Sequence, residues 1–294
     1  MSIEQQSRRD FLKTGALAAA GFSLLSSELF AGPKKPAVRN IGVQLWSVRE
    51  DMGKDAAGTL AKVAKMGYKQ VEGFGYSNGK FFGVPTDEFA KILAGNGLKM
   101  PSAHGNITSK DYTNGQLSDA FKKMVDDAKK VDQKFVIAPY MANEDRPQGK
   151  LMAEMFNKAG EHCKSMGMKF GYHNHDFEFK EYDGITMYKT LLDNTEKGLV
   201  TFEMDLYWVK FAKQNPMDWF KKYPGRFTHF HVKDHDPIKN VSVEVGEGDI
   251  NFQEIFNSKL SGAKYFIVEL ENYKRPALEG IEISLNNLKK LRFS

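Results

Sequence analysis

Residues 168–175 read Met-Lys-Phe-Gly-Tyr-His-Asn-His, a short apolar run that ends in polar side chains. Segments with helical periodicity lie on both sides of it, and the pairing of run and helix recurs at roughly the 25- to 40-residue spacing of one βα unit. A short run that is apolar at most positions is typical of a parallel strand buried on both faces. The pattern therefore predicts parallel strands that alternate with helices.

Eight such runs predict eight strands, at 41–46, 70–74, 98–103, 134–139, 168–174, 201–208, 226–232 and 265–270. Helices are expected between them, in the segment that ends at 66–67, at 86–96, 116–131, 149–166, 185–193 and 216–223, from about 252, and at 278–291. Eight strands alternating with eight helices favour a closed barrel over an open sheet. The predicted fold class is α/β, a (β/α)8 TIM barrel forming a single domain at 39–294.

An export signal is predicted at residues 1–31. Arg8 and Arg9 precede a short Ala-rich apolar stretch at 15–25, a combination that resembles a twin-arginine signal. That stretch is short for a bilayer span, so no stable membrane span is expected in the mature protein. Residues 32–38 are expected to be a linker, and whether the signal is cleaved near Ala31 or retained is left open. The predicted location is the periplasm.

Composition narrows the class of partner. The chain has 41% hydrophobic and 27% charged residues and a formal net charge of +5, with its lysines scattered rather than clustered. No segment resembles a nucleic-acid-binding arm, so a small-molecule substrate is expected and a nucleic-acid partner is not. The single cysteine, Cys163, excludes an intrachain disulfide and a thiolate metal cluster. A homo-oligomer is left open.

Polar side chains gather where the last four predicted strands end, which is where TIM barrels carry their active sites. Because side chains two apart share a face of a strand, these strands can direct four residues to one region: His173, Asp205, His231 and Glu269. Two imidazoles and two carboxylates suit manganese, cobalt, zinc or ferrous iron. The sequence therefore predicts one divalent metal ion bound by these four residues.

Four neighbouring polar residues are expected near this site. Glu203, His229 and Glu271 are interpreted as groups that support the ligands or the core, whereas His175 could support a ligand or contact the substrate.

Three motifs carry a resemblance to a known family. They are Tyr-His-Asn-His-Asp-Phe-Glu-Phe at 172–179, His-Val-Lys-Asp at 231–234 and Gly-Glu-Gly-Asp-Ile-Asn-Phe at 246–252, and Glu269 matches too. With them, the chain after residue 38 resembles the xylose-isomerase-like sugar isomerases and epimerases. The resemblance implies the same four metal ligands and a substrate pocket, which would include Glu72, His104 and Lys233. Trp46 and Trp208 could stack on a sugar or pack in the core.

One position departs from the pattern of many epimerases in that family. They carry a glutamate where this chain has His173, and that glutamate pairs with the one at Glu269 to move a proton between the two faces of the substrate. One member of the pair is an imidazole here. The departure argues against a symmetric epimerisation by two carboxylates, although a histidine can also act as an acid or base.

The common chemical step of the superfamily is removal of a proton next to a carbonyl, with Glu269 or His173 as the base. The superfamily is also similar to lyases that take the C2 proton of a 3-keto-glycoside and expel its aglycone, a reaction that needs one base. The hypothesis is therefore a periplasmic, metal-dependent 3-keto-glycoside 1,2-lyase acting on an unphosphorylated sugar. A keto-sugar isomerase or epimerase is the alternative, followed by a periplasmic sugar-binding protein.

Two other enzyme classes are disfavoured. The apurinic endonuclease branch of the superfamily uses a trinuclear zinc site with many more histidines than the seven in this chain. A nicotinamide-dependent dehydrogenase would carry a G-x-G-x-x-G sequence after a strand, and none of the predicted strands is followed by one.

Overall fold

The structure is a computed structural model that describes residues 40–182 and 184–291. The predicted export signal at 1–31 and the linker at 32–38 lie outside these residues, so both stay predictions. Among the described residues, none of the helices has the length and apolar character needed to cross a membrane.

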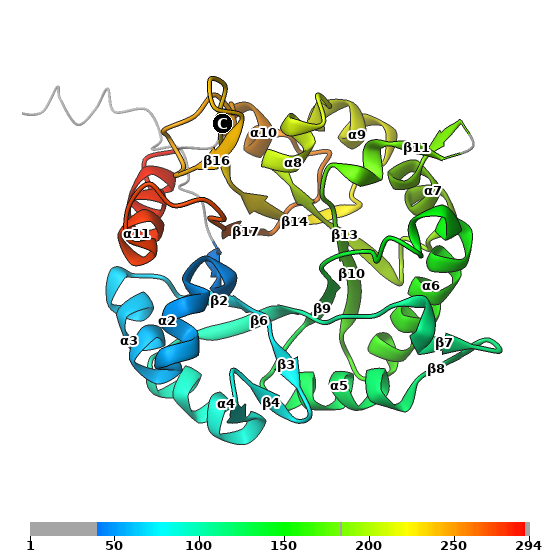
Figure 1. Cartoon of the computed structure of the whole chain (residues 1–294), viewed down its shortest axis with the longest axis horizontal. Coiled ribbons are helices and arrows are strands. Elements are labelled where there is room, and N and C mark those ends of the chain that lie inside the picture. Colours follow the sequence, from blue (N-terminus) through cyan, green and yellow to red (C-terminus); the bar gives the residue numbers. More distant parts are fainter. Residues whose placement is uncertain (1–39, 183, 292–294) are drawn as a thin grey trace, which may run out of the picture. The chain divides into compact units, whose positions relative to one another are not determined.

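Eight parallel strands close into a barrel, which confirms the predicted fold class (Figure 1). Each strand pairs with the next strand of the barrel along the chain, and the first pairs with the last. The barrel strands are β1 Ile41–Gln44, β2 Gln70–Gly73, β6 Lys99–His104, β9 Phe135–Ala138, β10 Lys169–His173, β13 Val200–Asp205, β14 Phe227–Val232 and β17 Tyr265–Val268.

Helices surround the barrel, as Figure 1 shows in a view along its axis. The α-helices are α2 Arg49–Lys54, α3 Ala56–Met66, α4 Thr86–Gly95, α5 Asp119–Lys130, α6 Gly149–Ser165, α7 Met187–Asn194, α8 Leu206–Phe211, α9 Pro216–Lys222, α10 Phe252–Asn257 and α11 Ala277–Leu288. Four short 3-10 turns are η1 Leu45–Val48, η2 Ser109–Asp111, η3 Arg146–Gln148 and η4 Phe177–Phe179. Buried apolar side chains fill the space between the strands and this outer layer.

Small antiparallel hairpins interrupt the βα units and correct two predicted helices. They are formed by β3 Tyr76–Ser77, β4 Lys80–Phe81 and β5 Val84–Pro85, by β7 Tyr112–Thr113 and β8 Gln116–Leu117, by β11 Glu181–Tyr182 and β12 Ile185–Thr186, and by β15 Asp234–Asp236 and β16 Val241–Val243. The helices expected at 116–131 and 185–193 begin later, because their first residues pair in these hairpins. The side chains of Ser118 and Thr186 then accept backbone N–H groups and start α5 and α7.

Among the barrel strands that are shorter than predicted, two end at a polar side chain that starts a helical turn. The strand expected at 201–208 stops at Asp205, whose carboxylate accepts the backbone N–H of Trp208 and starts α8. The strand expected at 41–46 stops at Gln44, whose side-chain oxygen accepts the N–H of Trp46 and starts η1. Trp46 and Trp208 therefore lie on helical turns at the carboxyl ends of the strands.

Glycines allow close packing at two places in the barrel and one in the outer layer. A Cβ added at Gly42 would lie 2.8 Å from Cδ1 of Ile267, and one added at Gly171 would lie 2.6 Å from Cδ1 of Ile137. A Cβ at Gly160 in α6 would lie 2.8 Å from the carbonyl oxygen of Leu199, just before β13. Each glycine therefore supports a contact that a larger residue would separate.

We predict that Gly160→Ala lowers the free energy of unfolding by roughly 1–2 kcal/mol. Overpacking typically costs about 1–3 kcal/mol, which exceeds the gain of about 1 kcal/mol in helix propensity. Gly95→Ala is the matched control, because Gly95 is an exposed residue of α4 with no atom within 4 Å of an added Cβ. Urea unfolding of both variants measures the difference. Equal or greater stability of Gly160→Ala relative to the native protein would contradict the close contact.

Candidate metal centre

The structure brings together the four residues predicted as metal ligands. His173 ends β10, Asp205 ends β13, His231 lies in β14, and Glu269 directly follows β17. One ligand atom from each lies within 4.8 Å of every other, and all four side chains are buried. Neighbouring parallel strands end side by side, which is why residues up to 96 positions apart in the sequence meet here.

The distances within this group are those of a compact polar cluster. His173 Nε2 lies 3.2 Å from Asp205 Oδ2, and His231 Nδ1 lies 2.9 Å from Glu269 Oε2. His231 Nδ1 is also 3.7 Å from Asp205 Oδ2. Imidazole nitrogen and carboxylate oxygen are the ligands that first-row divalent metals prefer.

Two ligand atoms of the group lie close together without forming a directed hydrogen bond. His231 Nδ1 and Glu269 Oε2 are buried and lie 2.9 Å apart as an ion pair, and among the described residues neither meets the geometry of a directed hydrogen bond. Buried polar atoms are nearly always paired, so such exceptions point to an ion or water that they share. Ligand atoms around an ion aim at a common centre rather than at one another. The donor set and its unsatisfied atoms therefore fit a divalent metal ion.

Hydrogen bonds outside the group orient two of the ligands. His173 Nδ1 lies 3.1 Å from the carbonyl oxygen of Pro139, so this nitrogen donates and Nε2 is left to act as a ligand. Asp205 uses Oδ1 to cap α8, and its backbone N–H donates to Asn174 Oδ1, which leaves Oδ2 facing the group. Both side chains are thus fixed before any ligand binds.

A second buried group lies on the other side of the His231 ring. It contains Glu72, His104, Glu203 and His231, again with ligand atoms within 4.8 Å of one another. Here the partners are hydrogen-bonded: His231 Nε2 lies 2.7 Å from Glu72 Oε1, and His104 Nε2 lies 3.1 Å from Glu203 Oε2. His231 therefore presents Nδ1 to the first group while its Nε2 is held by the second.

Glu72 is the centre of this second group. Gln44 donates to Glu72 Oε1 at 2.8 Å, and Ser102 donates to its other oxygen. Burial lowers the pKa of His104, but the Glu72 and Glu203 carboxylates raise it to about 9, so protons neutralise much of this group. A carboxylate that holds the distal nitrogen of a metal-binding histidine is the common supporting arrangement in metalloproteins. Contact of Glu72 and His104 with substrate stays a prediction, and His104 is the more open of the two, with 11% of its side chain exposed.

Lys233 adds a buried positive charge beside the first group. Its Nζ lies 2.8 Å from Asp205 Oδ2, 2.7 Å from Glu269 Oε2 and 2.7 Å from Glu271 Oε1. Burial alone would lower the pKa of Lys233, yet these three carboxylates raise it well above its usual value, so the ammonium stays charged.

The protein environment leaves three of the four ligands ready to bind a cation. Burial and the neighbouring His231 lower the pKa of His173 to about 4, so its imidazole is neutral. Burial raises the pKa values of Asp205 and Glu269, but the Lys233 ammonium and the neighbouring imidazoles of His173 and His231 together outweigh it and hold both below their usual range. Neutral imidazole and ionised carboxylate are the forms that bind metal ions.

Of the other predicted site residues, His175 lies beside the centre and Trp208 lies next to His175, whereas His229 and Trp46 pack elsewhere. The rings of His175 and His173 have centroids 4.9 Å apart, and Trp208 lies 5.5 Å beyond His175. His229 is instead buried against Tyr265, in a stack with centroids 4.5 Å apart. Trp46 is 41% exposed at the end of β1, where its ring contacts Phe74.

The motif at 246–252 folds around Asp234, which directly follows Lys233. Asp234 Oδ2 accepts the backbone N–H groups of Gly246 and Gly248, and Oδ1 accepts those of His235 and Ile250. This aspartate belongs to the motif at 231–234, and no role was predicted for it. It ties the loop after β16 to the end of β14, the strand that carries His231.

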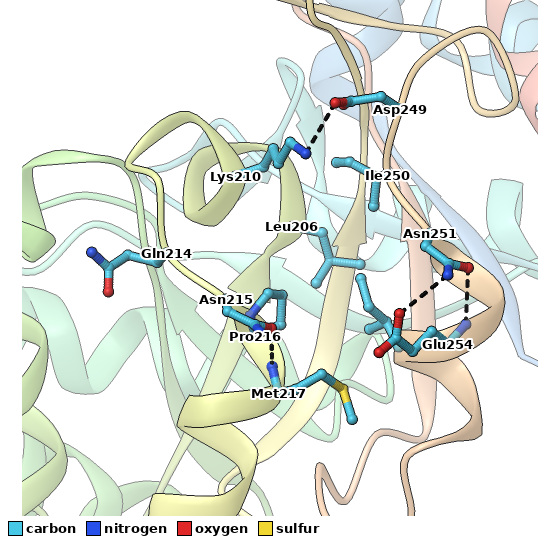
Figure 2. Close-up of a pocket in the computed structure, with 11 residues that line it drawn as sticks. Leu206, Lys210, Gln214, Asn215, Pro216, Met217, Asp249, Ile250, Asn251 and Glu254 are labelled. Atoms are coloured by element: carbon cyan, nitrogen blue, oxygen red, sulfur yellow. Dashed lines mark hydrogen bonds and ion pairs between the residues drawn. The ribbon is translucent and has the colours of Figure 1, made fainter.

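A pocket of about 310 Å³ lies outside the barrel beside this loop (Figure 2). It is lined by Leu206, Lys210, Gln214, Asn215, Pro216, Met217, Asp249, Ile250, Asn251, Glu254 and Ile255. None of the predicted site residues lines it. Lys210 of α8 reaches Asp249 at 3.0 Å across it, so the pocket marks where the loop docks on α8 rather than the candidate centre.

Some residues that support the segment around His173 were not predicted, and Glu178 in η4 is one of them. Tyr172 donates to one Glu178 oxygen at 2.6 Å, and the backbone N–H of His175 donates to the other at 2.8 Å. Burial raises the pKa of Glu178 to about 8 despite these hydrogen bonds. The only sequence signal for this role was its place in the quoted motif at 172–179.

Comparisons with known proteins identify the family and agree with the fold. The model of the family described as "Xylose isomerase-like TIM barrel" matches residues 60–291. A sugar phosphate isomerase/epimerase from Parabacteroides distasonis is 30% identical in sequence, with a TM-score of 0.76, over 85% of this chain and 97% of that one. An IolI protein with a bound zinc atom has a TM-score of 0.65 at 16% identity, over 84% of this chain and 96% of that one, a likeness of fold alone.

Among curated proteins, the inosose dehydratase of Clostridium perfringens is 29% identical over 158 residues. That match covers 45% of this chain and 50% of the relative. The chain therefore spans about half the length of the curated relatives it matches.

We predict that Glu178→Gln flattens the dependence of stability on pH. The folded-state pKa of about 8 exceeds the ordinary value of 4.5, so between these values the unfolded chain loses a proton that the folded chain keeps. Stability of the native protein should therefore fall as pH rises from about 4.5 to about 8, by an amount on the order of a few kcal/mol. A neutral glutamine should remove this fall while keeping the side chain's shape.

Thermal unfolding from pH 5 to pH 8.5 measures the effect, with exposed Glu181→Gln as the matched control. Parallel curves for the native protein and Glu178→Gln would mean that Glu178 is ionised in the folded state.

Proposed function

The chain belongs to the xylose isomerase-like TIM barrel family, and we propose that it is a metal-dependent enzyme that eliminates a leaving group next to a sugar carbonyl. In the specific form of this proposal it is a periplasmic 3-keto-glycoside 1,2-lyase. The observation that carries the proposal is the buried group of His173, Asp205, His231 and Glu269, in which an imidazole, His173, stands where many epimerases of the family have the glutamate that pairs with Glu269.

The family and the donor set imply one divalent ion at this group. Such an ion would polarise the substrate carbonyl and stabilise the negative charge that develops on its oxygen, an effect worth several kcal/mol. The side chains that would hold it are His173, Asp205, His231 and Glu269, all of which are buried. The metal's identity is open among manganese, cobalt, zinc and ferrous iron.

Glu269 is the better supported of the two candidate bases. Burial would raise its pKa, but Lys233 and His231 together hold the pKa below the usual range, so the carboxylate is ionised and in the form that can accept a proton. The Nδ1 hydrogen of His173 is donated to the carbonyl of Pro139, and its Nε2 is one of the nitrogen ligands proposed for the ion. A proton taken from the carbon next to the carbonyl leaves its electron pair to form a C=C bond. The leaving group then departs with the electrons of its C–O bond and takes up a proton.

The names of the relatives support elimination. An inosose is a cyclic polyol ketone, and a dehydratase removes water from its substrate, so the name inosose dehydratase describes an elimination on a keto-sugar-like ring. Loss of an aglycone from a 3-keto-glycoside is the same class of reaction with a different leaving group. An unphosphorylated substrate in the periplasm is proposed because of the export signal predicted at 1–31.

Isomerisation or epimerisation is the second candidate, favoured by the similarity to the Parabacteroides distasonis sugar phosphate isomerase/epimerase. It begins with the same removal of a proton, and it differs in that the proton returns to carbon while no bond to a leaving group breaks. Elimination needs one base, whereas the two-carboxylate epimerisation needs a partner for Glu269 that His173 replaces.

We predict that metal-loaded protein releases the aglycone from a 3-keto-glucoside and that a chelator abolishes this release until metal is restored. Glu269→Gln should lower the rate by about 10²–10⁴-fold, the usual contribution of a positioned base. Glu181→Gln, an exposed glutamate, is the matched control. The reactions are run in deuterated water on 3-keto-glucosides and on free ketoses.

The two measured products separate the candidates. Aglycone release with a new C=C bond supports the lyase. Deuterium incorporated at carbon without aglycone release would identify an isomerase or epimerase instead. Saturable sugar binding with no turnover of any substrate would identify a sugar-binding protein rather than an enzyme.

A further inference from the structure

We propose that the Lys233 ammonium is an internal cation that competes with the metal ion for Asp205 and Glu269 and is transferred to Glu271 when the metal binds. This inference rests on the proposed metal-dependent function and assigns a way of regulating metal occupancy at the same site.

Lys233 contacts two of the four predicted metal ligands. Its Nζ is buried and lies 2.8 Å from Asp205 Oδ2 and 2.7 Å from Glu269 Oε2. These two oxygens are the atoms that Asp205 and Glu269 offer to the candidate metal centre: Asp205 Oδ2 is 3.2 Å from His173 Nε2, and Glu269 Oε2 is 2.9 Å from His231 Nδ1. The ammonium therefore contacts half of the predicted ligand set.

The contact between Lys233 and Glu269 is an ion pair without a directed hydrogen bond. Glu269 Oε2 has no hydrogen-bond partner among the described residues, although the Lys233 ammonium lies 2.7 Å away. Lys233 thus neutralises this oxygen by proximity and does not donate a well-directed hydrogen bond to it. A contact of this kind offers charge compensation, which a metal ion bound to the same oxygen can also supply.

Glu271 supplies the alternative position. Nζ already donates to Glu271 Oε1 in good geometry at 2.7 Å, and Glu271 is two residues beyond Glu269 on the same chain segment. Its side chain is 26% exposed, whereas that of Glu269 is 4% exposed, so Glu271 lies towards solvent. A flexible lysine side chain can keep this hydrogen bond while its ammonium moves away from an arriving dication.

The exchange also explains why the metal-free site can be stable. Without a cation, two ionised carboxylates would be buried side by side, and uncompensated buried charge is strongly destabilising. Lys233 supplies one positive charge to them until an ion supplies two. Metal binding then replaces one cation with another, and its affinity depends on how readily Lys233 leaves.

The test measures the dissociation constant for Zn²⁺, and separately for Mn²⁺, by competition with a chromophoric chelator. Lys233→Met keeps the length of the side chain without the charge, and it should bind each metal at least tenfold more tightly than the native protein. Glu271→Gln weakens the alternative position, and it should bind each metal at least threefold less tightly. Lys210→Met is the matched control, because Lys210 pairs with Asp249 on the outer face, and it should leave both constants unchanged.

Thermal unfolding with and without metal adds a second readout. Metal-free Lys233→Met should unfold at a lower temperature than the native protein, and its rise in unfolding temperature on adding Zn²⁺ should be larger. A lysine with a purely structural role would lower both temperatures equally.

The outcomes keep the two proposals apart. If the native protein binds neither metal, the metal-dependent function fails. If it binds metal but Lys233→Met binds no more tightly, or Glu271→Gln no less tightly, the competition is disproved and the metal-dependent function stands. Should Lys233→Met fail to fold, the direction of change in Glu271→Gln alone decides.

Discussion

Buried negative charge is the constraint on which the carboxyl end of this barrel depends. Asp205, Glu269, Glu72 and Glu203 each have a relative exposure of 4% or less, and Glu271 extends the same cluster towards solvent. Carboxylates at such depth are tolerated only when cations or protons neutralise them. Three features of the site meet this requirement. The Lys233 ammonium lies beside three of the carboxylates, His231 contacts carboxylates on both sides of its ring, and His104 has a raised pKa beside Glu72 and Glu203.

His231 links the two halves of that arrangement. One ring nitrogen faces Glu269, and the other is held by Glu72, which Gln44 and Ser102 fix in turn. The orientation of a metal ligand therefore depends on strands β1, β2 and β6, none of which pairs with β14. A closed barrel makes such support possible, because side chains from all its strands share one interior.

The sequence predicted the barrel and the meeting of His173, Asp205, His231 and Glu269 for one physical reason. Their strands are neighbours in the barrel, and side chains two apart share a face, so local patterns were sufficient. Gln44 and Ser102 could not be predicted in the same way, since they act through Glu72, whose contact with His231 joins strands that are not neighbours in the barrel. The helical turn after Asp205 was missed because an aspartate that caps a helix also fits the end of a strand.

The replacement of a glutamate by His173 changes the charge of the centre as well as its chemistry. With a dication bound, the ion and Lys233 would bring three positive charges against the carboxylates of Asp205, Glu269 and Glu271, so the formal charges cancel. A glutamate at 173 would leave the same centre with one excess negative charge. Elimination builds negative charge on the substrate carbonyl oxygen, and a neutral centre opposes that charge less than an anionic one does. The same substitution that removes the second carboxylate of an epimerase thus favours an electrostatic environment in which a single base, Glu269, can begin an elimination.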